Sequence, residues 1–105
     1  MKAELPVQAI DVEIFCETWR DYDGEAKGFI PTNQIEEFII QLAGNSNCAL
    51  VMFPTRIKSR DPKKAHFRRK YIADLDIPTF KNFKNLMFYD VLLAIIKEKA
   101  KWVFN

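Results

Sequence analysis

The chain has 105 residues, enough for one domain with a hydrophobic core and too few for two. Hydrophobic residues make up 49% of the sequence, with nine Phe and two Trp, and this composition excludes an intrinsically disordered chain. The net charge of +2 conceals an asymmetry, because residues 11–37 carry eight acidic side chains whereas residues 56–70 carry eight Lys or Arg and one Asp.

The cysteine content and the apolar runs bear on the compartment. Cys16 and Cys48 are the only cysteines, too few for a disulfide framework, and we expect free thiols in a reducing compartment. No signal peptide or apolar run of membrane-spanning length is present, so we expect the fragment itself to be soluble. Because the sequence stops at Asn105 directly after an apolar Trp-Val-Phe, we expect it to be a piece of a larger protein.

After a lead-in at residues 1–10, we predict a single domain over residues 11–105. It contains helical pairs at about 11–44 and 61–104, joined by a connector at 45–60. Asp11 is the expected N-cap of the first helix. One face of this helix is apolar with the i, i+3, i+4, i+7 spacing, at Val12, Phe15, Cys16, Trp19 and Tyr22. Since Phe15 and Trp19 share this stripe, they are expected to be core anchors rather than a ligand cage.

The second helix shows the same spacing at Ile35, Phe38, Ile39 and Leu42. Thr32 is its expected N-cap, and Gly44 is a suitable residue just after its end.

The stretch between these two helices has the length and the glycine of a calcium loop. An EF-hand loop has twelve positions, with oxygen ligands at positions 1, 3 and 5, a Gly at 6 and a bidentate Glu at 12. With Gly28 at position 6, Asp23 and Glu25 fall at positions 1 and 3, Lys27 at 5 and Gln34 at 12. An ammonium cannot coordinate a cation, and an amide offers one oxygen in place of two. We therefore expect a structural loop with no metal and no cofactor, in which Asp23, Glu25, Gly28 and Gln34 are a weak remnant of a calcium site.

The second half of the chain begins with the connector, whose apolar run at residues 49–53 fits either a short strand or a segment laid across the core. Asp61 and Pro62 are the expected N-cap and first residue of a third helix. Its apolar residues are Phe67, Tyr71 and Leu75. The last helix is expected from about Met87, with an apolar side at Phe88, Val91, Leu92, Ile95 and Ile96.

A second, more degenerate loop precedes the last helix and places Leu86 at position 8, the position that Ile30 holds in the first loop. Ile30 and Leu86 are therefore expected side by side. A single helix-loop-helix buries too little surface to be stable alone. We predict an all-α fold in which two EF-hand-like helix-loop-helix units pair through a short antiparallel strand bridge between their loops.

Three runs of residues resemble a known family: FCETWRDYDGEAKGFIPTNQIEEFIIQL, RRKYIADLDIP and LMFYDVLLAII. They are similar to the C-terminal EF-hand-like domain of voltage-gated calcium and sodium channel alpha subunits, over roughly residues 12–100. The resemblance is specific in the first half, where the aromatic residue, the Trp, the Tyr-Asp pair and Glu-Ala-Lys-Gly match the calcium-channel branch most closely.

The resemblance implies a cytoplasmic regulatory module of a calcium-channel-like protein, at the cytoplasmic face of the plasma membrane. It would modulate gating through contacts with calmodulin or channel segments and not through tight calcium binding of its own. Implied partners are the rest of the parent channel and, in the full-length chain, calmodulin or a related EF-hand protein; the chain ends before any IQ motif. The alternative is a soluble EF-hand calcium sensor or adaptor that binds Ca²⁺ through Asp23 and Glu25.

Catalysis is not indicated. The chain has one His, and it lacks both a nucleophile–base spacing and a glycine-rich loop that could cradle phosphate. We therefore predict that the protein is not an enzyme.

Two further segments are candidate contact surfaces. The first is the basic segment at residues 56–70. It is either a solvated helix face, a contact for anionic lipid headgroups at about 1 kcal/mol per basic residue, or a contact for an acidic partner. Nucleic acid is disfavoured because no recognition-helix context accompanies the charge. Trp102 and Phe104, flanked by lysines, either resemble calmodulin-target anchors or pack on the first helix. The basic residues are Arg56, Lys58, Arg60, Lys63, Lys64, Arg68, Arg69 and Lys70.

Overall fold

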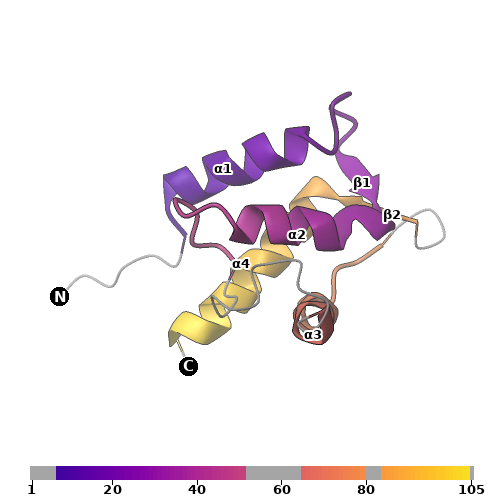
Figure 1. Ribbon diagram of the computed structural model, residues 1–105. Coiled ribbons are helices and arrows are strands. Elements are labelled where there is room, and N and C mark those ends of the chain that lie inside the picture. The colour runs from indigo at the N-terminus through magenta and orange to yellow at the C-terminus, as the bar shows by residue number, and fades with distance from the viewer. Residues whose placement is uncertain (1–6, 52–64, 80–83, 105) are drawn as a thin grey trace.

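The architecture is mostly helical, with one small sheet where the two halves of the chain meet (Figure 1). The computed structural model describes residues 7–51, 65–79 and 84–104. In Figure 1, α1 and α2 lie above α3, and α4 runs from the sheet toward the C-terminus. The elements in chain order are α1 (Ala9–Arg20), β1 (Phe29–Pro31), the 3-10 turn η1 (Thr32–Gln34), α2 (Ile35–Ala43), α3 (Ala65–Leu75), β2 (Asn85–Met87) and α4 (Phe88–Phe104).

Strands β1 and β2 pair antiparallel, with Ile30 opposite Leu86. The predicted strand bridge and its central pair are therefore confirmed. Both side chains are buried, at 0% and 2% exposure, so the centre of the sheet belongs to the core. Backbone hydrogen bonds extend the pairing on both sides, from Thr32 N to Lys84 O (2.7 Å) and from Phe88 N to Gly28 O (2.9 Å).

An aromatic cluster fills the core between α1, α2 and the start of α4. The fully buried ring of Phe15 contacts those of Trp19, Phe38 and Phe88, with centroids 5.9, 5.1 and 5.2 Å away. Trp19 meets the rings of Phe38 and Phe88 edge to face. Such pairs contribute about 0.5–1.5 kcal/mol each beyond the burial of their area. The cluster confirms that Phe15 and Trp19 are core residues.

The start of α1 differs from the prediction, because Asp11 is not the N-cap. The helix begins at Ala9, after Gln8, and Asp11 lies in its first turn. The buried carboxylate of Asp11 accepts hydrogen bonds from the backbone N–H groups of Gln8 (2.9 Å) and Ala49 (3.0 Å). An acidic residue in the first turn can reach back to a free amide as effectively as a cap reaches forward, and the sequence does not separate these roles. The first helix therefore begins before residue 11.

The start of α2 is a second correction. Thr32 is not its N-cap but the first residue of η1, and α2 follows from Ile35 after Gln34. The extended residue that precedes this helical turn is Pro31, with φ −62° and ψ 141°. Gly44 directly follows α2, as predicted.

The connector is laid across the core in the part that the structure describes. Residues 45–51 form neither helix nor strand, and Cys48, Leu50 and Val51 among them are buried. Residues 52–60, and the predicted helix start at Asp61 and Pro62, lie outside the described residues.

The last two helices follow the predicted pattern except at the start of α4. Tyr71 and Leu75 of α3 are buried, whereas the side chain of Phe67 lies outside the described part of the chain. The last helix starts at Phe88, because Met87 belongs to β2.

Candidate functional site at the Asp23 loop

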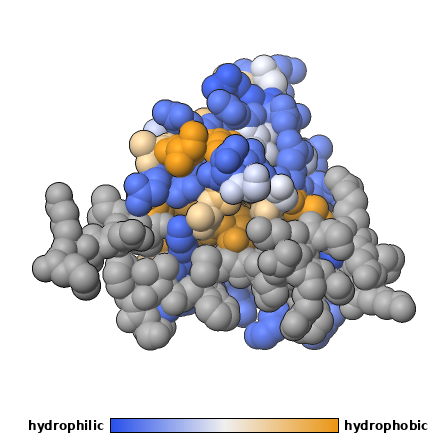
Figure 2. Space-filling model, turned by 60° about the vertical axis from the view of Figure 1, so that its left-hand side comes forward, coloured by the Kyte–Doolittle hydropathy of each residue, from blue (hydrophilic) through white to orange (hydrophobic). Residues whose placement is uncertain are grey.

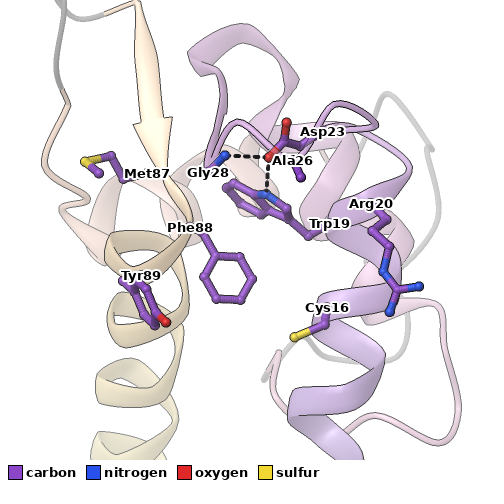
Figure 3. A pocket seen from close by; sticks show the side chains of 9 residues that line it. All are labelled: Cys16, Trp19, Arg20, Asp23, Ala26, Gly28, Met87, Phe88 and Tyr89. Carbon is purple, nitrogen blue, oxygen red and sulfur yellow. Dashed lines mark hydrogen bonds between the residues drawn. The ribbon is translucent and has the colours of Figure 1, made fainter.

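The carboxylate of Asp23 organises the loop between α1 and β1. Its Oδ1 accepts a hydrogen bond from Lys27 N (2.8 Å), and its Oδ2 accepts one from Gly28 N (2.8 Å). Oδ2 also accepts the indole N–H of Trp19 at 3.2 Å (Figure 3). Asp23 is 7% exposed, so these contacts compensate a carboxylate largely withdrawn from water.

The charge of this carboxylate is stabilised. Burial raises the pKa of Asp23, but the three hydrogen bonds and the nearby charge of Lys27 together favour the ionised form by more, so its pKa lies below the ordinary value. Hydrogen bonds to the charged form are one of the three physical causes of such shifts. Asp23 is therefore held in its ionised form by the donors of the loop and of α1.

The backbone of the loop turns through two positive φ angles. Gly28 has φ +88° and Ala26 has φ +53°. The Gly28 angle is one that residues with a Cβ rarely adopt, which explains the glycine at this point. The turn aims the N–H of Gly28 at Asp23 and leads directly into β1 at Phe29.

The side chains of Glu25 and Gln34, the other two side chains of the remnant calcium loop, are not hydrogen-bond partners of Asp23. The side chain of Glu25 is 78% exposed and pairs with Lys27, with Oε2 and Nζ 3.4 Å apart. The side-chain Oε1 of Gln34 is buried and accepts no hydrogen bond from any described residue. Within the described ranges, no group of three His, Cys, Asp or Glu is placed to hold a metal ion.

A cavity of about 390 Å³ adjoins the loop, between α1 and the junction of β2 with α4 (Figure 3). The aromatic side chains of Trp19, Phe88 and Tyr89 contribute to its walls. Its complete lining is Cys16, Trp19, Arg20, Asp23, Ala26, Gly28, Met87, Phe88 and Tyr89. No pattern in the sequence predicts this cavity, because it brings together residues that are far apart along the chain.

Exposed apolar side chains extend from this cavity, beginning at the end of β2 and continuing along α4. Met87 is 46% exposed, Tyr89 71% and Leu93 52%. Apolar surface also appears between hydrophilic side chains on the face shown in Figure 2. One residue indicates this surface in the sequence. Leu93 is apolar but does not belong to the predicted apolar side of the last helix.

The predicted basic surface is only partly placed by the structure. Arg69 and Lys70 are exposed on α3, and Lys70 Nζ lies 3.4 Å from Asp74 Oδ2. Trp102 and Phe104 lie in the last turn of α4, but their side chains are outside the described part of the molecule. Five members of the basic segment lie outside the described residues: Arg56, Lys58, Arg60, Lys63 and Lys64.

Arg68 differs from this expectation, because it is a buried residue. Its side chain is 4% exposed, and its Nε lies 3.4 Å from Glu36 Oε1, which joins α3 to α2. An arginine stem packs on apolar surface while its guanidinium pairs with a carboxylate. Arg68 is therefore part of the helix packing and is not available as a surface contact.

No protein-family model matches the chain, and no curated protein matches it. None of the helices in residues 7–51, 65–79 and 84–104 is both long and apolar enough to span a bilayer.

Proposed function

We propose that this chain is a cytoplasmic regulatory module of a voltage-gated calcium-channel-like protein. It acts at the cytoplasmic face of the plasma membrane through contacts with calmodulin or other channel segments, and it does not bind calcium tightly itself. The proposal combines the resemblance of residues 12–100 to that family with the geometry of the Asp23 loop and of the strand bridge.

The shape of the loop supports a pair of EF-hand-like units. Gly28 has the positive φ expected of the glycine at position 6. The two position-8 residues of the predicted loop frames, Ile30 and Leu86, face each other across the sheet. Helices precede and follow each of these strands, so the arrangement has the order of two helix-loop-helix units.

The observation that carries the proposal is the hydrogen bonding of Asp23. Each carboxylate oxygen has two acceptor sites, and both sites of Oδ2 are used by the N–H groups of Gly28 and Trp19. Oδ1 already accepts Lys27 N and keeps one site. Because Ca²⁺ takes six to eight oxygen ligands, a loop with one remaining Asp23 site, a Lys at position 5 and an amide at position 12 favours a structural role.

A titration of isotope-labelled, chelator-stripped protein with Ca²⁺ and then Mg²⁺ tests this role. We expect the backbone amide signals of Lys27 and Gly28 to stay in place into the millimolar range. A double variant, Lys27→Asp with Gln34→Glu, restores carboxylates at positions 5 and 12 and is the matched control, because it should respond to calcium. Saturation of the wild-type signals at micromolar Ca²⁺ would contradict the proposal and support a soluble calcium sensor.

Calorimetry tests the proposed binding of calmodulin or other channel segments. Calmodulin is the first protein to titrate against the domain, once with calcium and once with chelator, followed by peptides from the cytosolic segments of such channels. Binding with micromolar or tighter affinity supports a regulatory module, whereas the lack of binding to all of them contradicts it.

A further inference from the structure

The cavity beside the Asp23 loop has the dimensions and walls of a binding site. Its volume of about 390 Å³ falls within the range of about 300–1,000 Å³ that is typical of ligand pockets. Figure 3 shows the cavity between the start of α4, which contributes Phe88 and Tyr89, and α1, which contributes Cys16 and Arg20.

The floor of the cavity is fixed by packing. Trp19 is 4% exposed, meets the ring of Phe88 edge to face at 5.2 Å, and is held by Asp23 through its indole N–H. Tyr89 and Met87, by contrast, are substantially exposed at the rim. A rigid apolar floor with an exposed apolar rim suits one large apolar group that enters from outside, because such a group loses its water without displacing a packed side chain.

Two charged side chains line the cavity, Arg20 and Asp23. Asp23 is 7% exposed, and its carboxylate already accepts three N–H hydrogen bonds from the protein. Arg20 is exposed and forms no ion pair with any described residue. Arg20 is therefore the charged side chain of the lining that a ligand from outside can pair with, and an arginine fork is suited to a carboxylate.

Acidic side chains near the cavity limit the negative charge that a ligand can carry. Glu13 and Glu17 are exposed on α1 but do not line the cavity, and they repel any further negative charge near this helix. The complementary ligand is thus a large apolar group with a single carboxylate next to it.

We propose that this cavity anchors a partner protein segment through one aromatic side chain, with the carboxylate of a neighbouring residue placed on Arg20. The inference rests on the proposed function, since it takes the domain to act through protein contacts. It adds the surface that makes the contact and the chemistry of the segment that is bound.

The test uses blocked tetrapeptides and the isotope-labelled domain in buffer with chelator, so that a calcium response of the loop cannot enter. The first peptide is Ala-Asp-Phe-Ala; its two controls replace Asp by Asn or Phe by Ala. We expect the Asp-Phe peptide to shift the indole N–H signal of Trp19 and the methyl signal of Met87. The Ala control should bind at least about tenfold more weakly, because the apolar burial is lost, and the Asn control about two- to fivefold more weakly, as for an exposed ion pair.

Two variants of the domain test whether the carboxylate of the peptide Asp lies on Arg20. Arg20→Gln should bind the Asp and Asn peptides equally, whereas Lys97→Gln, which removes an equal charge from an exposed site on α4 outside the cavity, should keep the wild-type preference. An unchanged amide spectrum away from the cavity verifies that both variants fold. The Asp-Phe peptide should also slow alkylation of the cavity cysteine, Cys16, and leave the slow reaction of the buried Cys48 unchanged.

Four outcomes would overturn the inference. They are equal binding of the Phe and Ala peptides, a preference for Asp that survives Arg20→Gln, peptide shifts that map to Arg69 and Lys70 of α3, and protection of Cys16 by anionic phosphatidylserine vesicles but not by peptide. Because these readouts contain no metal and no calmodulin, the inference and the proposed function can fail separately.

Discussion

The indole N–H of Trp19 donates to Oδ2 of Asp23 over 3.2 Å, so one carboxylate serves the aromatic core and the loop at once. The same oxygen holds Gly28 N, the last amide before β1. The loop therefore keeps its shape through a bond to the core. Removal of the Asp23 carboxylate affects both the loop and the aromatic core.

We expect Asp23→Ala to lower the free energy of unfolding by about 2–3 kcal/mol. The change leaves three N–H donors without their acceptor, one of them on a buried Trp. Asp23→Asn should cost less, because the amide keeps one acceptor oxygen. Urea unfolding followed by far-UV circular dichroism measures both, with the exposed Glu25→Gln as a control expected within about 0.5 kcal/mol of wild type. Equal effects of Asp23→Ala and Glu25→Gln would show that the Asp23 bonds do not stabilise the fold.

The contribution of Asp23 should depend on pH. Its folded pKa lies below the ordinary value, so between the folded pKa and the unfolded value of about 3.9 the unfolded chain binds more protons. The stabilisation is thus complete above the unfolded pKa and is lost as the pH falls through the folded pKa. We expect the difference in unfolding free energy between wild type and Asp23→Asn to be constant above about pH 5 and to shrink below about pH 4. A difference that persists unchanged to about pH 2 would contradict this cause.

Two neighbours in β2 should respond differently to truncation. Leu86 is 2% exposed and faces Ile30, whereas Met87 is 46% exposed. Leu86→Ala leaves a cavity in the core and should cost about 2–5 kcal/mol, and Met87→Ala should cost less than about 1 kcal/mol. Thermal unfolding of the two variants in parallel measures the contrast. Similar midpoints would mean that the strand bridge is not part of the cooperative core.

The ion pair between Arg68 and Glu36 should contribute to the free energy of unfolding. It should account for only part of the stabilisation that Arg68 provides. Arg68 is 4% exposed and Glu36 is 39% exposed. Arg68→Ala removes the packing of the stem as well as the charge, so we expect the free energy of unfolding to fall by about 1–3 kcal/mol. A double-mutant cycle with Glu36→Gln should assign about 0.5–1 kcal/mol of this loss to the ion pair. Lys70→Ala, on the exposed side of α3, is the control and should be nearly neutral. A neutral Arg68→Ala would argue that α3 is not packed through this residue.

The sequence predicted the parts of this fold that are set by local periodicity and loop register. The stripe containing Phe15 and Trp19 specified which face of α1 enters the core, and the position of Gly28 specified that Ile30 would face Leu86. The first relationship follows from the 3.6-residue repeat within one segment, and the second follows from placing the same twelve-residue loop frame on two segments.

What the sequence did not predict depends on contacts between distant segments. The sequence makes Asp11 look like a cap, because its bond to Ala49, which folding brings across from the connector, leaves no local signal. The sequence also places Arg68 on the surface, because its charge is visible there and its partner on α2 is not. No local pattern indicates the cavity at Arg20, because its two walls come from distant parts of the chain.

The small sheet also has a mechanical consequence. No residue separates β2 from α4, and η1 follows β1 just as directly, so each strand continues into a helical segment without a linker. Hydrogen bonds at both ends of the ladder, at Thr32 and Phe88, prevent the strands from sliding past each other. The ladder therefore ties the start of α4 to the end of the first loop, so the two halves of the domain are joined by backbone hydrogen bonds as well as by side-chain packing.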